Sequence, residues 1–246
     1  MATAPLFSAL GAGARFEPER DWLKETRQID VSDSKVRITA MKLTQALQSV
    51  PPRIAAIQDF VRRMPFAASP ESNAMCASDV LRAGSGDCHS KGVLFTALCR
   101  AAGIPARLLF VTVETRFLTG ILRGGPPTMP HAVSQVLANG NWLSTDGYVV
   151  DPPLFEQAKR RLRRAGLDCG WGIVSDATPQ WGGQADCLQQ FAEDDVVKIH
   201  GHFDEPAQFY AGEQQQSQHW LNWLKFALGA HMVNRRVAQV RRGTGK

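Results

Sequence analysis

The chain has 246 residues, of which 28 are basic and 23 acidic, so its formal net charge is +5 and its pI is about 9.1. Hydrophobic residues make up 44% and charged residues 21%, which is ordinary globular usage and excludes a fibrous or intrinsically disordered chain. This length favours one large core with extensions, and the modest positive charge permits an anionic partner without requiring one.

The first twenty residues lack the basic start and the apolar core of a secretory signal. No segment approaches the roughly 18 apolar residues of a membrane helix. The cysteines form an odd, scattered set without a CxxC pair, which indicates free thiols rather than a disulfide framework or a zinc knuckle. They are Cys76, Cys88, Cys99, Cys169 and Cys187. We therefore expect a cytoplasmic protein without a membrane anchor.

Helices are expected first along the chain. Apolar residues recur with a helical period over 35–49, and a proline pair at 51–52 opens a second helix that reaches about Met64. A short helix follows near 76–82 and leads into a turn at 84–86.

The next helix is expected to begin at Cys88. Its apolar residues repeat at helical spacing, and Gly103 with Pro105 supplies the expected end. The cysteine therefore lies in the first turn of a helix that is apolar enough to be buried.

Strands follow the Cys88 helix. Residues 106–115 are rich in β-branched and aromatic types and predict a buried strand. A β-hairpin is predicted from an alternating run at 131–137, a turn at Asn139-Gly140 and a second strand at 142–145. The intervening segment, 116–130, contains three glycines and three prolines, and we interpret it as a flap over a site, with a plain connection as the alternative.

Past Asp151 the pattern weakens. We expect a basic helix near 154–165, an irregular stretch around 169–187 and a final helix over about 213–238. That last helix is expected to pack on the core through Trp220, Trp223, Leu224, Leu228 and Met232.

Cys88 has the surroundings of an activated thiol. Unpaired amide hydrogens and the helix dipole favour negative charge at a helix N-terminus, so they lower the pKa of a thiol there. Asp87 is placed to cap the helix, and the amide of Cys88 can face a developing oxyanion. Cys99 lies on the apolar face of the same helix and is expected to be structural.

A thiol nucleophile needs a base, and His131 and Asp146 are placed to provide one. His131 opens the first strand of the predicted hairpin and Asp146 follows the second, so cross-strand pairing brings them together if the register holds. The imidazole then pairs with the thiolate of Cys88, while the carboxylate fixes the imidazole tautomer.

Two segments carry a resemblance to a known family. They are GDCHSKGVLFTALCRAAGIPAR and PHAVSQVLANGNWLSTDGYVVDP, and the lead CASDVLRAGSGDC resembles the same family. The sequence resembles the core of the transglutaminase-like superfamily over about residues 36–153. In that family the corresponding positions are the catalytic cysteine, histidine and aspartate, which match Cys88, His131 and Asp146.

The resemblance implies an α+β, papain-like fold, with the nucleophile helix packed on an antiparallel sheet and extra helices at both ends. It implies no cofactor, calcium included. We divide the chain into an N-terminal extension (1–35), the core (36–153) and a C-terminal helical extension packed on it (154–246), within one domain overall.

We therefore predict a thiol enzyme that acts on an amide or ester through a Cys88 thioester. Members of the family include crosslinking transferases, peptidases, amidases, deglycosylating enzymes and inactive binding modules. Hydrolysis is favoured over transfer to an amine, because water is always available unless a lid excludes it. The expected partners are a peptide, a protein or a small amide or ester, and neither a nucleic acid nor a membrane.

Several alternatives stay open. The chain could be an inactive binding module of the same fold, or an anion-binding protein that uses the basic segment 159–164, KRRLRR. His200 and His202 form an HxH pair that could hold a metal. Asn73 is a candidate second oxyanion donor, whereas His89 is expected to point away from Cys88 around the helix.

Overall fold

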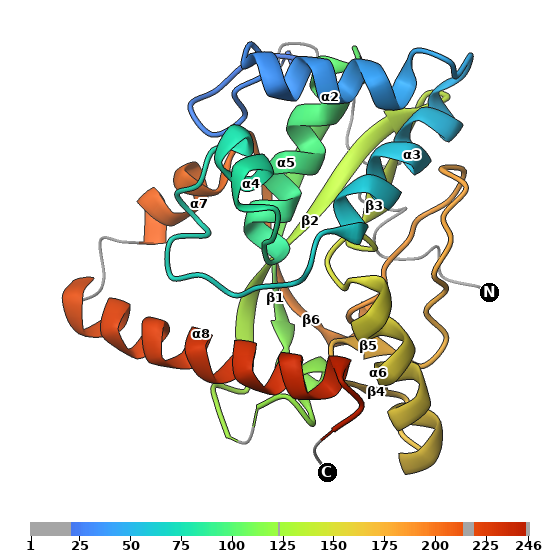
Figure 1. Ribbon diagram of the computed structural model, residues 1–246. Coiled ribbons are helices and arrows are strands. Elements are labelled where there is room, and N and C mark those ends of the chain that lie inside the picture. The colour runs from blue at the N-terminus through green and yellow to red at the C-terminus, as the bar shows by residue number, and fades with distance from the viewer. Residues whose placement is uncertain (1–20, 123, 214–218, 245–246) are drawn as a thin grey trace.

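The computed structural model describes residues 21–122, 124–213 and 219–244, and of residues 213 and 219–228 only the backbone. Figure 1 shows helices on both sides of one sheet. In chain order the helices are α2 (Ser34–Thr44), α3 (Val50–Arg63), α4 (Ala77–Ala83), α5 (Cys88–Ala101), α6 (Pro152–Ala165), α7 (Pro206–Glu213) and α8 (His219–Arg241). The strands are β1 (Ala106–Glu114), β2 (Thr128–Ala138), β3 (Asn141–Thr145), β4 (Cys169–Gly170), β5 (Ile173–Val174) and β6 (Val196–Phe203).

The main sheet has the strand order β3-β2-β1-β6, and every neighbouring pair is antiparallel. Alternate residues of β1 serve two cores, because successive side chains of a strand point to opposite faces. Leu108 and Phe110 join the core formed with α2 to α5, whereas Leu109 and Val111 join the core formed with α6 and α8. The predicted α+β fold, with helices packed on an antiparallel sheet, is confirmed.

Helix α5 is the centre of the first core. Every residue from Cys88 to Arg100 is buried, because α2, α3 and α4 surround the helix and β1 and β2 lie beneath it. A helix that is buried on all sides needs the apolar run that the sequence provides. Its first residue is thereby held in the interior of the protein.

The predicted hairpin is confirmed in the pairing of β2 with β3. Asn139 and Gly140 have φ angles of 51° and 81°, the left-handed pair that a two-residue type I′ turn requires. The turn fixes a register in which Ser134 lies opposite Thr145. This register sets the relative positions of His131, near the start of β2, and of Asp146, directly after β3.

The segment 116–130 is not one long flap. A single 3₁₀ turn forms at Thr115–Leu118 and β2 already begins at Thr128, so the irregular part is short. Phe117 and Ile121 are buried in the second core, and their burial pins the first half of the segment to the sheet.

The region after residue 153, expected as a helical extension, also contains strands. β6 is the fourth strand of the main sheet, and it pairs with β1 through two register shifts. Its sequence, VVKIHGHF, does not alternate cleanly, so the strand and α7 were missed. Met232, expected in the core, is 59% exposed; the described part of α8 packs through Val237 and Val240.

Some expectations fall outside the described residues. They concern the N-terminal segment 1–20 and the side chains of Trp220, Trp223, Leu224 and Leu228. In the part of the chain that the structure does describe, every helix is too short or too polar to cross a membrane.

Candidate active site

Cys88 is the first residue of α5, and Asp87 caps the helix. The Asp87 carboxylate accepts hydrogen bonds from the amides of His89 (3.1 Å) and Ser90 (3.2 Å), and the Ser90 hydroxyl in turn accepts from the Asp87 amide (2.9 Å). The cap therefore uses the amides that follow Cys88 and not that of Cys88 itself. The thiol-bearing residue is 8% exposed.

His131 and Asp146 meet across the β2–β3 pair. The register puts Asp146 diagonally from His131 on the same face of the sheet, which is close enough for long side chains to touch. The His131 Nε2 and Asp146 Oδ2 atoms are 3.6 Å apart, and the side chains are 1% and 0% exposed. The rings of Phe117 and Phe191 pack edge-on against the imidazole at 6.1 and 5.0 Å.

The Asp146 carboxylate is held from the opposite side by a later segment. It accepts hydrogen bonds from the amides of Gln189 (2.6 Å) and Gln190 (3.3 Å). The Asp146 amide donates to the carbonyl oxygen of Cys187 at 3.2 Å. Sequence reasoning missed these contacts, because backbone amides in an irregular segment leave no residue-type signal.

The thiol and the imidazole of His131 stabilise each other's charge. Burial alone raises the pKa of Cys88, but the imidazoles of His89 and His131 outweigh it and lower the pKa to about 6. Burial lowers the pKa of His131, but the Cys88 thiolate and Asp146 raise it to about 9. Between these values the favoured state is a thiolate beside an imidazolium.

The other thiols lack this activation. Burial raises the pKa of Cys169 to about 11 and raises those of Cys99 and Cys187 as well, and no imidazole offsets the effect. Each of the five cysteines is a free thiol, as expected. Cys88 is the one whose surroundings favour the anion.

His89 does not point away from Cys88, contrary to the expectation from helical spacing. Its Nδ1 atom lies 3.4 Å from the Cys88 sulfur, and its Nε2 atom lies 3.0 Å from the Tyr210 hydroxyl. Spacing along a helix failed here because the His89 ring is held by the Tyr210 hydroxyl, which α7 brings from a distant part of the chain. Two imidazoles, not one, approach the thiol.

Residues 37–147, slightly less than half of the chain, match the model of the transglutaminase-like superfamily. This part of the chain is transglutaminase-like. The match confirms the predicted resemblance, and its segment includes Cys88, His131 and Asp146. No curated protein sequence matches the chain significantly.

Solved structures that are similar to this one include two that are named as proteases. The first is named "Putative Cysteine Protease" and comes from Cytophaga hutchinsonii; it aligns with 77% of this chain and 50% of its own, at 18% identity and a TM-score of 0.48. The second, "Putative Protease" from Parabacteroides distasonis ATCC 8503, aligns with 47% of this chain and 24% of its own, at 18% identity and a TM-score of 0.35. The chain thus spans half of one protein and about a quarter of the other.

Among the described residues, the HxH pair belongs to no group of three or more potential metal ligands. His200 lies at a register shift of β6 and its Nε2 is 2.8 Å from the Thr112 hydroxyl. Potential ligand atoms do cluster at Asp87, Cys88 and His89, within 4.8 Å of one another. We assign this cluster to thiol chemistry, because Asp87 is engaged in the cap and a helix N-terminus disfavours a cation.

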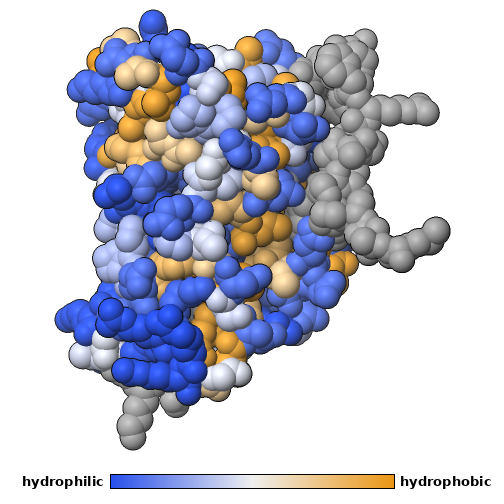
Figure 2. Space-filling view, turned by 90° about the vertical axis from the view of Figure 1, so that its right-hand side faces the viewer, coloured by the Kyte–Doolittle hydropathy of each residue, from blue (hydrophilic) through white to orange (hydrophobic). Residues whose placement is uncertain are grey.

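The remaining candidates make contacts with other segments of the chain. Asn73 is half-buried before α4, and its carbonyl oxygen accepts from Gln28 at 2.9 Å. In the basic helix α6, Lys159 donates to the carbonyl oxygens of Ser175 and Ala177, so part of its charge is used internally. Figure 2 shows the strongly hydrophilic lower end of the face on which α6 lies.

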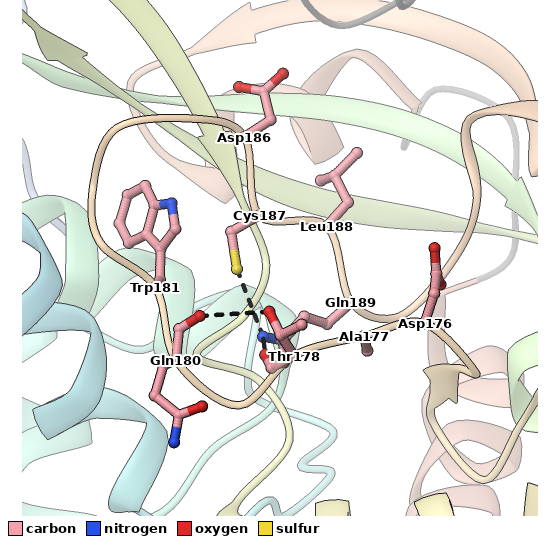
Figure 3. A pocket seen from close by; sticks show the side chains of 9 residues that line it. All are labelled: Asp176, Ala177, Thr178, Gln180, Trp181, Asp186, Cys187, Leu188 and Gln189. Atoms are coloured by element: carbon pink, nitrogen blue, oxygen red, sulfur yellow. Dashed lines mark hydrogen bonds between the residues drawn. The ribbon is translucent and has the colours of Figure 1, made fainter.

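A pocket of about 140 Å³ lies on the segment that holds Asp146. Figure 3 shows the Gln189 side chain reaching across it toward Cys187, with the Gln189 amide nitrogen 3.4 Å from that sulfur. Its lining consists of Asp176, Ala177, Thr178, Gln180, Trp181, Asp186, Cys187, Leu188 and Gln189. None of the three predicted catalytic residues lines it, but two of its lining residues, Cys187 and Gln189, hydrogen-bond to Asp146 through their backbones.

Proposed function

We propose that this protein is a cysteine-dependent acyl-transfer enzyme in which Cys88 is the nucleophile, His131 the general base and acid, and Asp146 the residue that orients the imidazole. One observation carries the proposal. A buried thiol at a helix N-terminus has its pKa lowered to about 6 by neighbouring imidazoles, one of which lies beside a buried carboxylate. Perturbed titrating groups that converge in this way are typical of catalytic sites.

In the first half of the reaction the Cys88 thiolate attacks the carbonyl carbon of an amide or ester. The negative charge that develops on the carbonyl oxygen faces the amide of Cys88, which the helix cap leaves available. His131 then gives its proton to the departing amine or alcohol. A thioester forms between the acyl group and the sulfur.

In the second half His131, now neutral, takes a proton from the incoming nucleophile. Water attacks the thioester, the thiolate leaves, and a carboxylic acid is released. An amine in place of water gives a new amide by the same steps. Hydrolysis is favoured over transfer to an amine, because water is always available unless a lid excludes it.

The substrate class is a peptide, a protein or a small amide or ester, because the acyl carbonyl is the group on which this set of side chains acts. A simple activated ester, p-nitrophenyl acetate, tests the chemistry without knowledge of the natural acyl group. We expect repeated turnover, with one acetyl group on Cys88 seen by mass spectrometry during the reaction. Adducts trapped from cell extract would then identify the natural acyl group.

The variants Cys88→Ala and Cys99→Ala provide the control pair, since both remove a buried thiol from α5. Only the first should abolish turnover. The alternative function, a transglutaminase-like binding module without activity, predicts that neither the ester nor acyl donors from extract turn over above the level of Cys88→Ala. A single acetylation event without turnover would also contradict the proposed enzyme.

A further inference from the structure

The second imidazole at the thiol is anchored at both of its nitrogens. His89 is 7% exposed, with Nδ1 at 3.4 Å from the Cys88 sulfur and Nε2 at 3.0 Å from the Tyr210 hydroxyl. Tyr210 belongs to α7, more than one hundred residues later in the sequence. Contacts at both nitrogens fix the orientation of the ring.

An aromatic cluster holds α7 in place. Phe209, next to Tyr210, stacks on Phe110 of β1 with ring centroids 4.3 Å apart and an interplanar angle of 17°. Phe203 packs edge-on against both rings at 5.5 Å. The His89 ring itself lies 5.7 Å from that of Phe110. The sheet thus positions Tyr210, and Tyr210 positions His89.

The protonation of His89 follows from its two partners. A thiolate only accepts hydrogen bonds, so the Nδ1 atom that faces the sulfur must carry a hydrogen whenever Cys88 is ionised. When His89 is neutral, its Nε2 atom accepts, and the Tyr210 hydroxyl is the donor that faces it. Burial lowers the pKa of His89, but the Cys88 thiolate raises it overall, and the imidazolium carries the same hydrogen on Nδ1. Tyr210 therefore favours the tautomer of His89 that donates to the sulfur.

We propose that His89, held in its donating tautomer by Tyr210, is a second hydrogen-bond donor to the Cys88 thiolate, in addition to the ion pair that His131 makes. The inference rests on the proposed function insofar as the thiolate is the nucleophile, but it concerns the resting protein and requires no turnover. Tyr210 is a positioning residue in this arrangement, because it acts through His89.

Charged and titrating groups face this pair from several elements. Asp87 precedes the thiol, His131 of β2 and Asp146, directly after β3, lie on the sheet side, and Tyr148 is near enough to interact with the thiolate. Their effects on Cys88 are common to the wild type and to variants at His89 and Tyr210. Differences between these proteins therefore report on the His89 contact.

The experiment measures the rate of Cys88 alkylation by iodoacetamide as a function of pH, with peptide mass spectrometry to identify the thiol. Because a hydrogen bond to a charged group shifts ionisation by about one pH unit or more, His89→Ala should react about tenfold more slowly than wild type near pH 5. The two rates should converge at high pH, where the thiol is ionised in both proteins.

Two further variants distinguish the hydrogen bond from packing. Asparagine carries an N–H group near the position of the histidine Nδ1, so His89→Asn should retain most of the wild-type profile. Tyr210→Phe should slow alkylation at low pH in the wild type but have no effect in the His89→Asn background. His231→Asn removes an exposed histidine of α8 and should change nothing.

An unchanged pH profile in folded His89→Ala would overturn the inference, and so would His89→Asn behaving like His89→Ala. If His89→Ala does not fold, Tyr210→Phe alone decides, since an unchanged profile in that variant contradicts the role of Tyr210. Alkylation needs no substrate, so a protein that lacks acyl turnover can still show the expected shifts. Failure of the proposed function is thereby distinguished from failure of this inference.

Discussion

The ammonium of Lys91 donates a hydrogen bond to the carbonyl oxygen of Val149 at 2.9 Å, and so ties the helix that carries Cys88 to the turn that follows Asp146. The same nitrogen donates to the carbonyl oxygens of Tyr148 (3.0 Å) and Met64 (2.6 Å). The Lys91 side chain is fully buried, and burial lowers its pKa to about 7.

Replacement of Lys91 by methionine should lower the free energy of unfolding by roughly 2–4 kcal/mol, because three carbonyl oxygens lose their donor inside the protein. Urea denaturation measures the change. Lys198→Met, at an exposed position of β6, is the matched control and should stay within about 0.5 kcal/mol of wild type. Equal stabilities of the two variants would contradict a structural role for Lys91.

The pH dependence of kcat/KM should be bell-shaped. The thiolate of Cys88 accumulates as pH rises through about 6, so activity rises there. The imidazolium of His131 deprotonates as pH rises through about 9. Activity falls there, because a neutral imidazole has no proton to give to the leaving group. Because the ionisation of Cys88 and that of His131 are coupled, the two apparent pKa values of the profile describe the pair and not either residue alone. Activity that climbs steadily beyond pH 10 would argue against the ion pair.

Asp146→Asn should reduce kcat by roughly 10²–10⁴-fold, because the amide has no negative charge to set beside the imidazolium and can hold the wrong tautomer. The fold should survive, since the amide oxygen can still accept from Gln189. Asp146→Ala should in addition lose about 2 kcal/mol of stability, because the amides of Gln189 and Gln190 are left without an acceptor. Steady-state kinetics and denaturation of both variants separate the two roles. Full activity of Asp146→Asn would remove Asp146 from the proposed mechanism.

Gly120 and Gly124 provide a matched test of how the segment 116–130 is packed. Both have positive φ, 84° and 75°, so alanine costs backbone strain of about 1 kcal/mol at either site. A Cβ atom at Gly120 would lie 2.3 Å from Trp171, whereas one at Gly124 meets nothing within 4 Å. Gly120→Ala should therefore lose at least about 2 kcal/mol more stability than Gly124→Ala. Similar melting temperatures would indicate a loose flap after all.

The sequence was most informative where local pattern and chemistry coincide. The helix from Cys88, the strand after Pro105 and the Asn139-Gly140 hairpin each follow from short-range rules, and together they bring His131 within 3.6 Å of Asp146. These features depend on periodicity, on turn residues and on one cap, all of which can be read from neighbouring positions.

The parts that escaped prediction depend on contacts between distant segments. β6 forms only because β1 offers it an open edge, and its own sequence, interrupted by Gly201, gives no clear alternation. The approach of His89 to the thiol depends on Tyr210, which α7 delivers from the far end of the chain. No local pattern contains such information.

The hydrogen bonds from the Gln189 and Gln190 amides to the Asp146 carboxylate determine when the site can become complete during synthesis of the protein. A nascent chain that ends near Val150 already has its thiol, its imidazole and its carboxylate, but not the amides that lock the carboxylate in position. On our proposal the growing polypeptide would stay catalytically silent until some forty more codons have been translated and that stretch has cleared the ribosome exit tunnel.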